Sequence, residues 1–195
     1  MSVLSRLFQR DRPPPDALTP LSPDERVVAW ATTADQAAVI ATPRGLWLPT
    51  PGGRPERISW HLVDKAVWRD GALTVTPAVD TGAGVLDELP PRTVRLAVPR
   101  NLPETVRTRV ENSIAFSRHY PLTSAGEMPA GGVPAGGVPT GGTRAGGVRV
   151  VGRRVPGRDG LTWQAVFDPG TDRDDPLVRA YVARLIQQAT ADLTA

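Results

Sequence analysis

A run of short apolar segments between residues 37 and 76 constrains the fold of this chain more than any other feature. Each segment is only three or four residues long, which is too short for a helix, and each is bounded by Pro, Gly, Arg or Asp. The spacing predicts an antiparallel β-meander on which the rest of the chain packs. The segments are residues 38–41, 46–48, 58–60, 66–68 and 73–76.

Two turns support the meander. Residues 43–45, Pro-Arg-Gly, predict a tight turn in which Gly45 accepts a positive φ that other side chains resist. Arg69-Asp70-Gly71 predicts a hairpin with Asp-Gly at its tip. We expect a further strand before the meander, at residues 26–32, and another after the 82–91 loop, at residues 93–98.

A helix is expected after the last of these strands. Pro103 suits the first helical position, and Glu104 complements the positive end of the helix. His119-Tyr120-Pro121 is expected to end it. The apolar stripe consists of Val106, Val110, Ile114 and either Phe116 or Ser117. The predicted fold class is therefore α+β, mostly β: a closed barrel of about seven strands over residues 25–120, capped by one helix.

Residues 39–48 and 58–68 resemble the bacterial pleckstrin-homology-like (PH-like) domain family. The first range resembles the second hairpin of those domains, with an apolar strand, a Thr, a turn containing Arg and another apolar strand. The resemblance covers about residues 26–120 and implies a PH-like antiparallel barrel. Lipid-binding members use Lys and Arg on and beside the first hairpin loop, but residues 33–36 contain neither. The resemblance thus implies no phosphoinositide binding by that route.

The C-terminal part predicts a second hairpin and a helix. Residues 148–155 and 161–167 form the two strands, and Asp175-Pro176 gives a strong helix start. We expect the apolar face of this helix to dock on the barrel or on another subunit, because about fifty residues cannot bury it alone. That face comprises Leu177, Val178, Tyr181, Val182, Leu185, Ile186, Ala189 and Leu193.

Two segments outside the barrel have unusual composition. Residues 121–147 include a five-residue Ala-Gly-Gly-Val-Pro-like period, which predicts a flexible loop between the barrel and the hairpin-helix region of residues 148–195. Residues 1–24 are expected to be a flexible tail. Its first ten residues are amphipathic, and they either fray or contact a membrane surface or a partner through Val3, Leu4, Leu7 and Phe8.

Composition excludes several kinds of chemistry. The chain has no cysteine, so thiolate nucleophiles and Cys-ligated metal sites are excluded. No run of about 18 apolar residues and no secretory leader is evident, so we expect a cytoplasmic protein. The sequence pI near 10.1 comes almost entirely from arginine, since Lys65 is the sole lysine. Basicity of this kind is weak support for a nucleic-acid partner, and we expect none.

Motifs for catalysis and metal binding are missing from the sequence. His61 and His119 have no partner at metal-ligand spacing, and there is no Gly-x-Ser-x-Gly nucleophile motif. The acidic residues between 168 and 175 lack the ligand spacing of an EF-hand. We therefore predict no catalytic, cofactor-binding or metal-binding residues, and a protein that is not an enzyme.

Four residues are candidates for partner binding: Trp47, Arg149, Arg153 and Arg154. Trp47 alternates out of phase with Leu46 and Leu48, so it is expected outside the barrel as an anchor for a partner. The other tryptophans, at positions 30, 60, 68 and 163, are expected in the core. The arginines belong to a dense cationic run, which is either a binding surface or a set of solvated strand positions.

The leading hypothesis is a non-catalytic interaction module of the PH-like class that binds another protein. The alternative is a peripheral membrane or polyanion binder that uses the N-terminal amphipathic segment and the arginine-rich hairpin. The sequence leaves the oligomeric state open.

Overall fold

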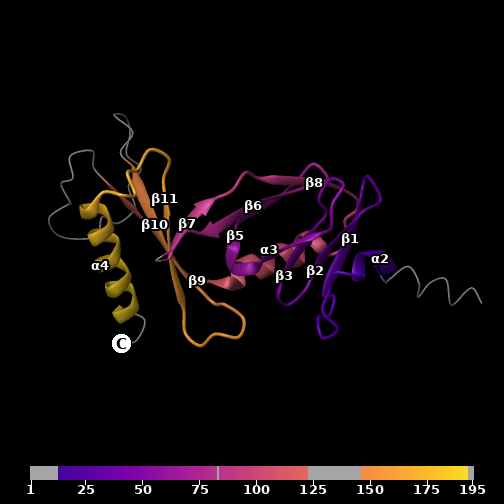
Figure 1. Cartoon of the computed structure of the whole chain (residues 1–195), viewed down its shortest axis with the longest axis horizontal. Coiled ribbons are helices and arrows are strands. Elements are labelled where there is room, and N and C mark those ends of the chain that lie inside the picture. The colour runs from indigo at the N-terminus through magenta and orange to yellow at the C-terminus, as the bar shows by residue number, and fades with distance from the viewer. Residues whose placement is uncertain (1–12, 83, 123–145, 193–195) are drawn as a thin grey trace, which may run out of the picture. The chain divides into compact units, whose positions relative to one another are not determined.

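A computed structural model describes residues 13–82, 84–122 and 146–192 of the chain. The fold is α+β and mostly β, as predicted, with eleven strands, three α-helices and one 3-10 helix in these residues. The chain divides into two compact units (Figure 1). The first unit contains residues up to 79 together with 88–114 and 154–160, and the second contains 80–87, 115–153 and 161 onward.

The first unit begins with a short helix, α2 (Pro15–Leu18), and contains seven strands, the 3-10 helix η1 and helix α3. The predicted meander strands are all present: β2 has the expected ends, and the ends of the others differ by at most four residues from those expected. The elements are β1 (Ala29–Thr33), β2 (Ala38–Ala41), β3 (Gly45–Leu48), β4 (Glu56–Ser59), η1 (Trp60–Leu62), β5 (Val63–Arg69), β6 (Ala72–Asp80), β8 (Arg92–Val98) and α3 (Leu102–Ser113).

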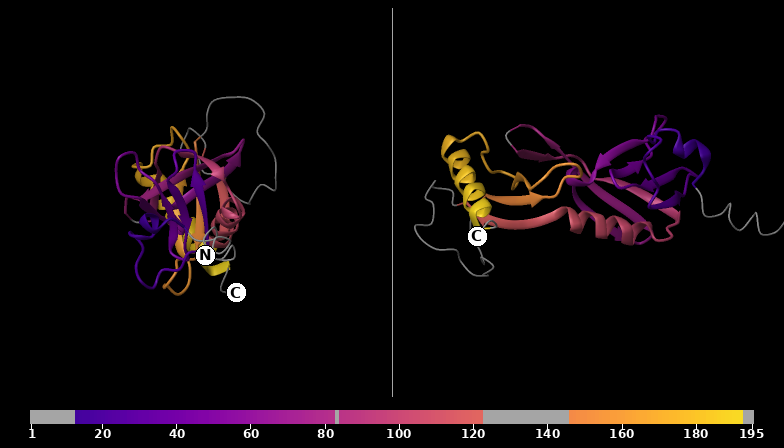
Figure 2. Two further views of the ribbon diagram at one scale, coloured as in Figure 1. Left: turned by 90° about the vertical axis from the view of Figure 1, so that its right-hand side faces the viewer. Right: turned by 90° about the horizontal axis from the view of Figure 1, so that it is seen from below.

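The strands of the first unit pair in the order β4-β3-β2-β1-β8-β6-β5, and every pair is antiparallel. Among the described residues β4 pairs only with β3 and β5 only with β6, so the predicted closure into a barrel is wrong. The chain passes from β4 to β5 through the three residues of η1, which turn a corner without forming a hairpin. Helix α3 contacts both η1 and β5 at this opening. In Figure 2 the helix lies alongside the strands of the first unit.

One hydrophobic cluster fills the first unit. Leu46, Leu48, Leu73 and Val75 are at most 1 % exposed, and alternation along each strand directs them to the same side. Helix α3 adds a buried stripe at helical spacing. That stripe consists of Leu102, Val106 and Val110. Because β1 pairs with both β2 and β8, strands β1 to β4 share this core with strands β5, β6 and β8.

Two expectations for the connecting segments are corrected. Helix α3 ends at Ser113, and the residues expected to continue it form strand β9 (Ile114–Pro121). Ile114 is already extended, with φ −93° and ψ 115°, and the β-branched and aromatic residues from here to Tyr120 fit a strand. Within the 82–91 region, expected as a loop, residues Val85–Glu88 form strand β7.

The second unit contains β7, β9, β10 (Gly147–Arg153), β11 (Thr162–Phe167) and α4 (Pro176–Asp192). The predicted hairpin is confirmed as the antiparallel β10–β11 pair, and β7 pairs in parallel with β11. The predicted start of α4 is also confirmed, because the Asp175 carboxylate accepts a hydrogen bond from the Leu177 backbone N–H at 2.8 Å. Helix α4 packs on β10 (Figure 1).

Part of the predicted apolar face of α4 packs within the second unit, whereas Leu177 is exposed and Leu193 lies outside the described residues. Val182 and Leu185 pack with Val148, Val150 and Ala165 of the hairpin. Phe116 and Tyr120 of β9 add to this cluster. Strand β9, part of which was predicted as helix, therefore adds two aromatic side chains to those that β11 supplies, Trp163 and Phe167.

Two of the predicted segments lie outside the described residues. These are the amphipathic part of the N-terminal tail, up to residue 12, and residues 123–145 of the predicted 121–147 loop. At the described ends of that loop, Pro121 belongs to β9 and Gly147 to β10, so these two residues are not loop as predicted. None of the helices in the described residues has both the length and the apolar character needed to cross a membrane.

The core of the second unit gives a first prediction. Leu185 of α4 is 7 % exposed, whereas Leu177 on the same helix is 69 % exposed. Replacing Leu185 with Ala should lower the free energy of unfolding by about 2–5 kcal/mol, because it removes buried methyl groups and leaves a cavity. The matched control Leu177→Ala should change it by less than about 0.5 kcal/mol. Urea unfolding followed by circular dichroism measures both, and equal effects would contradict the described packing of α4.

Candidate functional site

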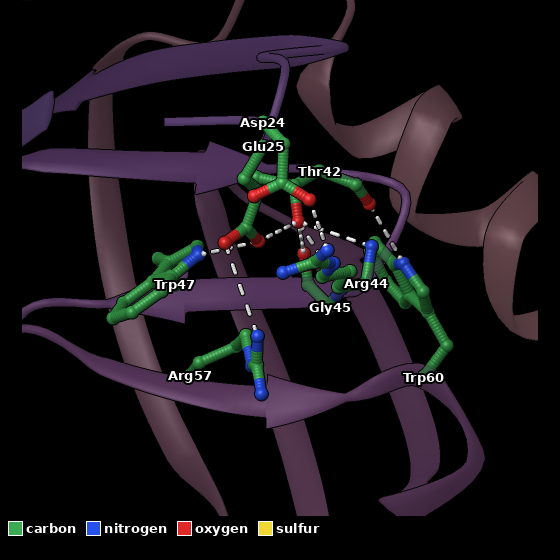
Figure 3. A network of polar contacts seen from close by, with 8 residues as sticks. All are labelled: Asp24, Glu25, Thr42, Arg44, Gly45, Trp47, Arg57 and Trp60. Carbon is green, nitrogen blue, oxygen red and sulfur yellow. Dashed lines mark hydrogen bonds and ion pairs between the residues drawn. The ribbon is translucent and has the colours of Figure 1, made fainter. Parts of the chain in front are cut away.

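A buried carboxylate lies at the centre of a polar network in the first unit. Glu25 precedes β1, and its side chain has no exposed area. Its Oε1 accepts a hydrogen bond from the Thr42 hydroxyl at 2.5 Å and another from the Trp47 indole Nε1 at 3.2 Å (Figure 3). The carboxylate thus fixes the turn after β2 and the aromatic side chain on β3 to the chain segment that leads into β1.

Thr42 organises the turn between β2 and β3. Its hydroxyl oxygen accepts hydrogen bonds from the backbone N–H groups of Arg44 and Gly45, both at 3.2 Å. Its carbonyl oxygen accepts one from the Trp60 indole at 2.9 Å. A single threonine therefore links the turn, the buried carboxylate and the core tryptophan (Figure 3).

The turn forms where the sequence predicted it, but Gly45 has a different role from the one expected. The φ angle of Gly45 is not positive. A Cβ at this position would instead lie 2.4 Å from the carbonyl oxygen of Ile58 on β4. Glycine is required here because β3 and β4 approach each other closely.

Trp47 lies on the outer face of β3, opposite the buried Leu46 and Leu48, as its phase in the sequence predicted. Its cross-strand neighbour is Arg57 of β4. The Arg57 guanidinium carbon lies 5.8 Å from the centroid of the indole, within the range of a cation–π contact. Trp47 is half-buried, because its ring edge is bonded to Glu25 and one face is covered by Arg57.

Arg57 also offsets the charge of Glu25. The distance from Arg57 Nη1 to Glu25 Oε2 is 3.8 Å, which is an ion pair without a hydrogen bond. Among the described residues Oε2 accepts no hydrogen bond, so the electrostatic contact with Arg57 is its principal compensation. The side chain of Arg57 is 37 % exposed, so water reaches this pair from one side.

A groove of about 410 Å³ adjoins the network. Arg44 and Arg57 line it together with Ser59, His61 and residues 155–157. Arg44 pairs with Asp24, the neighbour of Glu25, so each arginine in the groove is held by one of two consecutive acidic residues (Figure 3). The groove therefore presents two oriented guanidinium groups, a serine hydroxyl and an imidazole.

The three arginines predicted as a binding surface do not share one environment. Arg149 is half-buried and Arg154 is exposed, but Arg153 is only 1 % exposed. The prediction that Arg153 is a surface residue is therefore wrong. Arg154 donates from its backbone N–H to the Ser113 carbonyl at 2.8 Å and from Nη1 to the Asn112 carbonyl at 3.4 Å. It satisfies carbonyl groups at the C-terminus of α3, where a cation is favoured.

The tryptophans expected in the core have different outcomes. Trp60 is buried at 3 % exposure, as predicted. Trp163 is half-buried, with its ring 5.4 Å from that of Phe116 in an edge-to-face arrangement. Trp30 is half-buried beneath the Arg100 guanidinium. Trp68 is 40 % exposed near the end of β5, so its assignment to the core is wrong.

Sequence reasoning missed Glu25, Thr42 and Arg57 as parts of a site. Glu25 marks the edge of the proline-rich N-terminal segment, where an acidic residue is ordinarily solvated. Arg57 follows the glycine-rich turn by a few positions, and the sequence alone does not pair it with Trp47. A one-residue change in the register of β3 and β4 would separate them, so this part of the site depends on strand pairing.

Two observations concern metal and proton chemistry in the described residues. They contain no group of three or more His, Cys, Asp or Glu side chains that could hold a metal ion. The pKa of the Arg107 guanidinium is raised by its hydrogen bond to Glu104 and by the charges of Glu104 and Glu111. The pKa of Arg173 is raised by its contact with Asp87. A guanidinium with a raised pKa stays protonated, so neither group is a proton donor or acceptor at neutral pH.

Comparison of the chain with protein-family models, with curated proteins and with solved structures gave no match.

Thr42 provides a test of the network. Thr42→Val keeps the shape of the side chain but removes the donor to Glu25 and the acceptor for two backbone N–H groups. We expect the free energy of unfolding to fall by about 1–3 kcal/mol, because buried polar groups lose their partners. The control is Thr74→Val, because the Thr74 hydroxyl pairs with that of Thr93 on the surface. This substitution should lower the free energy of unfolding by less than about 0.5 kcal/mol. Denaturant unfolding compares the two, and a Thr42→Val protein as stable as the control would refute the network.

The Arg57–Glu25 pair gives a second test by a double-mutant cycle. Arg57→Gln should destabilise the protein by about 1–2 kcal/mol, less than the roughly 3–5 kcal/mol for a fully buried pair, because the guanidinium is partly hydrated. Adding Glu25→Gln should recover part of the loss, since it removes the uncompensated charge. Additive effects of the two substitutions in urea unfolding would show that the two side chains do not interact.

Proposed function

We propose that this chain is a non-catalytic interaction protein, and that its first unit is a PH-like domain that binds another protein through the surface around Trp47. This surface, called the Trp47 face below, comprises Trp47, Arg57 and Arg44 with the adjoining groove. The observation that carries the proposal is the half-exposed Trp47 on the outer face of β3, held in place by Glu25 and flanked by Arg57.

The PH-like assignment is supported by the strand order. Four sequential strands, β1 to β4, pair as a meander, and β5, β6 and β8 pair as a second group joined to β1 through β8. One amphipathic helix, α3, follows β8, which is the seventh strand of the first unit, and packs on the core that both groups share. Seven antiparallel strands with one following helix is the arrangement that the resemblance in residues 26–120 implies.

The first hairpin loop argues for a protein ligand over a phosphoinositide. Residues 33–36 carry no cation, and the Thr33 hydroxyl donates to the Asp35 carboxylate at 2.5 Å. An acidic side chain in this loop disfavours a phosphorylated headgroup. The Trp47 face, in contrast, combines the residue types that contribute most to protein–protein affinity, an anchored Trp and an Arg.

Pre-organisation strengthens this argument. The Trp47 ring is fixed by its hydrogen bond to Glu25 and by the contact with Arg57, so binding costs little side-chain entropy. The alternative function, binding of a membrane or polyanion through the N-terminal segment and the arginine hairpin, gains no comparable support. Its segment up to residue 12 lies outside the described residues, and Arg153 is buried.

Site-specific photo-cross-linking tests the proposal. A benzoylphenylalanine introduced at the exposed Pro156, which lines the groove and leaves both arginines in place, should cross-link a discrete protein in a lysate of the source organism. The same probe at Arg69, an exposed arginine on β5, should not. The captured protein, once identified and purified, should bind the wild-type chain at least about 30-fold more tightly than it binds Trp47→Ala, which corresponds to about 2 kcal/mol.

Circular dichroism of Trp47→Ala must first show a folded protein, because the ring also contacts Glu25. Equal cross-linking from positions 156 and 69, or unchanged affinity of folded Trp47→Ala, would refute the proposal.

A further inference from the structure

We infer that the groove beside Trp47 receives an aspartate or glutamate side chain of the partner protein, held by the guanidinium groups of Arg44 and Arg57. This inference rests on the proposed function and names the chemistry recognised at the same surface. It follows from three features of the groove: how its arginines are held, which donors they leave, and what total charge they have.

The two guanidinium groups are held from one side only. Asp24 pairs with Arg44, and the fully buried Glu25 lies 3.8 Å from Arg57. The arginine side chains themselves are 46 % and 37 % exposed. Each guanidinium is therefore oriented by an acidic residue of the same segment (Figure 3). Each arginine side chain also remains partly open to solvent, and both arginines line the groove.

Most of the donors of these arginines are not used within the described residues. A guanidinium carries five N–H donors in one plane. Arg44 donates through Nη2 to Asp24, and Arg57 makes an ion pair and a ring contact but no side-chain hydrogen bond to a described residue. Several donors therefore remain for a ligand, in the forked geometry that matches a carboxylate.

The charge balance disfavours a doubly charged ligand. Two arginines and two carboxylates sum to zero, so the groove has no excess positive charge for a phosphate dianion. A phosphate would meet the arginines with Asp24 and Glu25 directly behind them. A single carboxylate can accept two parallel hydrogen bonds from one guanidinium. These bonds depend on matching geometry, so they form even where the net charge of the groove is zero. The Ser59 hydroxyl, which also lines the groove, is a further donor.

The surroundings fit a polypeptide that carries this carboxylate. The groove has room for one side chain, and Val155 and Pro156 give it an apolar wall. Trp47, the cross-strand neighbour of Arg57, supplies an adjacent apolar contact. A side-chain carboxylate allows the partner backbone to continue past the groove onto this tryptophan. A partner segment with an acidic residue next to an apolar residue is the expected ligand.

NMR titration of the full chain tests the inference with small probes. N-acetylglutamate amide should shift the Nε–H resonances of Arg44 and Arg57 in a saturable way, with a dissociation constant on the order of millimolar. N-acetylglutamine amide, the neutral analogue, should cause no such shift. Arg57→Gln and, separately, Arg44→Gln should each weaken binding by at least about tenfold. The control Arg69→Gln, on β5, should leave it unchanged.

The outcomes separate this inference from the proposed function. Shifts that do not saturate, equal shifts with the glutamine analogue, or tighter binding of N-acetylglycine or inorganic phosphate would overturn the inference. If Arg57→Gln fails to fold, Arg44→Gln still decides. Cross-linking from position 156 without carboxylate binding would refute the inference alone. Carboxylate binding without any cross-linked protein would refute the proposed function.

Discussion

The pairing of β1 with both β2 and β8 is the constraint on which the first unit depends. It joins the four-strand meander to the group of β5, β6 and β8, so that residues from both groups bury their apolar faces in one cluster. The sheet remains open between β4 and β5, and α3 covers that opening with Leu102, Val106 and Val110. The helix is thus part of the core, and the outer faces of β3 and β4 are left for other contacts.

The buried Glu25 connects this architecture to the candidate site. Burying a carboxylate at the edge of the core is costly unless hydrogen-bond donors and an opposite charge lie beside it. Thr42 and Trp47 supply the donors, and Arg57 supplies the charge. The same contacts that stabilise the carboxylate hold the tryptophan and the arginine in fixed positions. Stability and the proposed recognition therefore depend on one set of side chains.

Local sequence patterns predicted strands, turns and helix starts correctly where tertiary contacts did not favour a different structure. The meander strands, the 156–160 hairpin turn and the Asp175 cap all follow from turn chemistry, alternation and capping. The same rules failed for residues 114–121, where a helical stripe continued past Ser113 although the chain forms β9. Pairing in the sheet and burial of Phe116 and Tyr120 beside Val148 and Val150 outweigh the helical periodicity there.

For the site, the sequence by itself determined that Trp47 faces away from Leu46 and Leu48, because strand alternation fixes side-chain direction. It also determined that cysteine chemistry is absent. Only the tertiary structure decided that Glu25 is buried, that Arg57 lies across from Trp47, and that Arg153 is enclosed while Arg154 caps α3. These facts depend on strand register and on contacts between residues far apart in the chain. A linear pattern contains no information about such distances until the strands have paired.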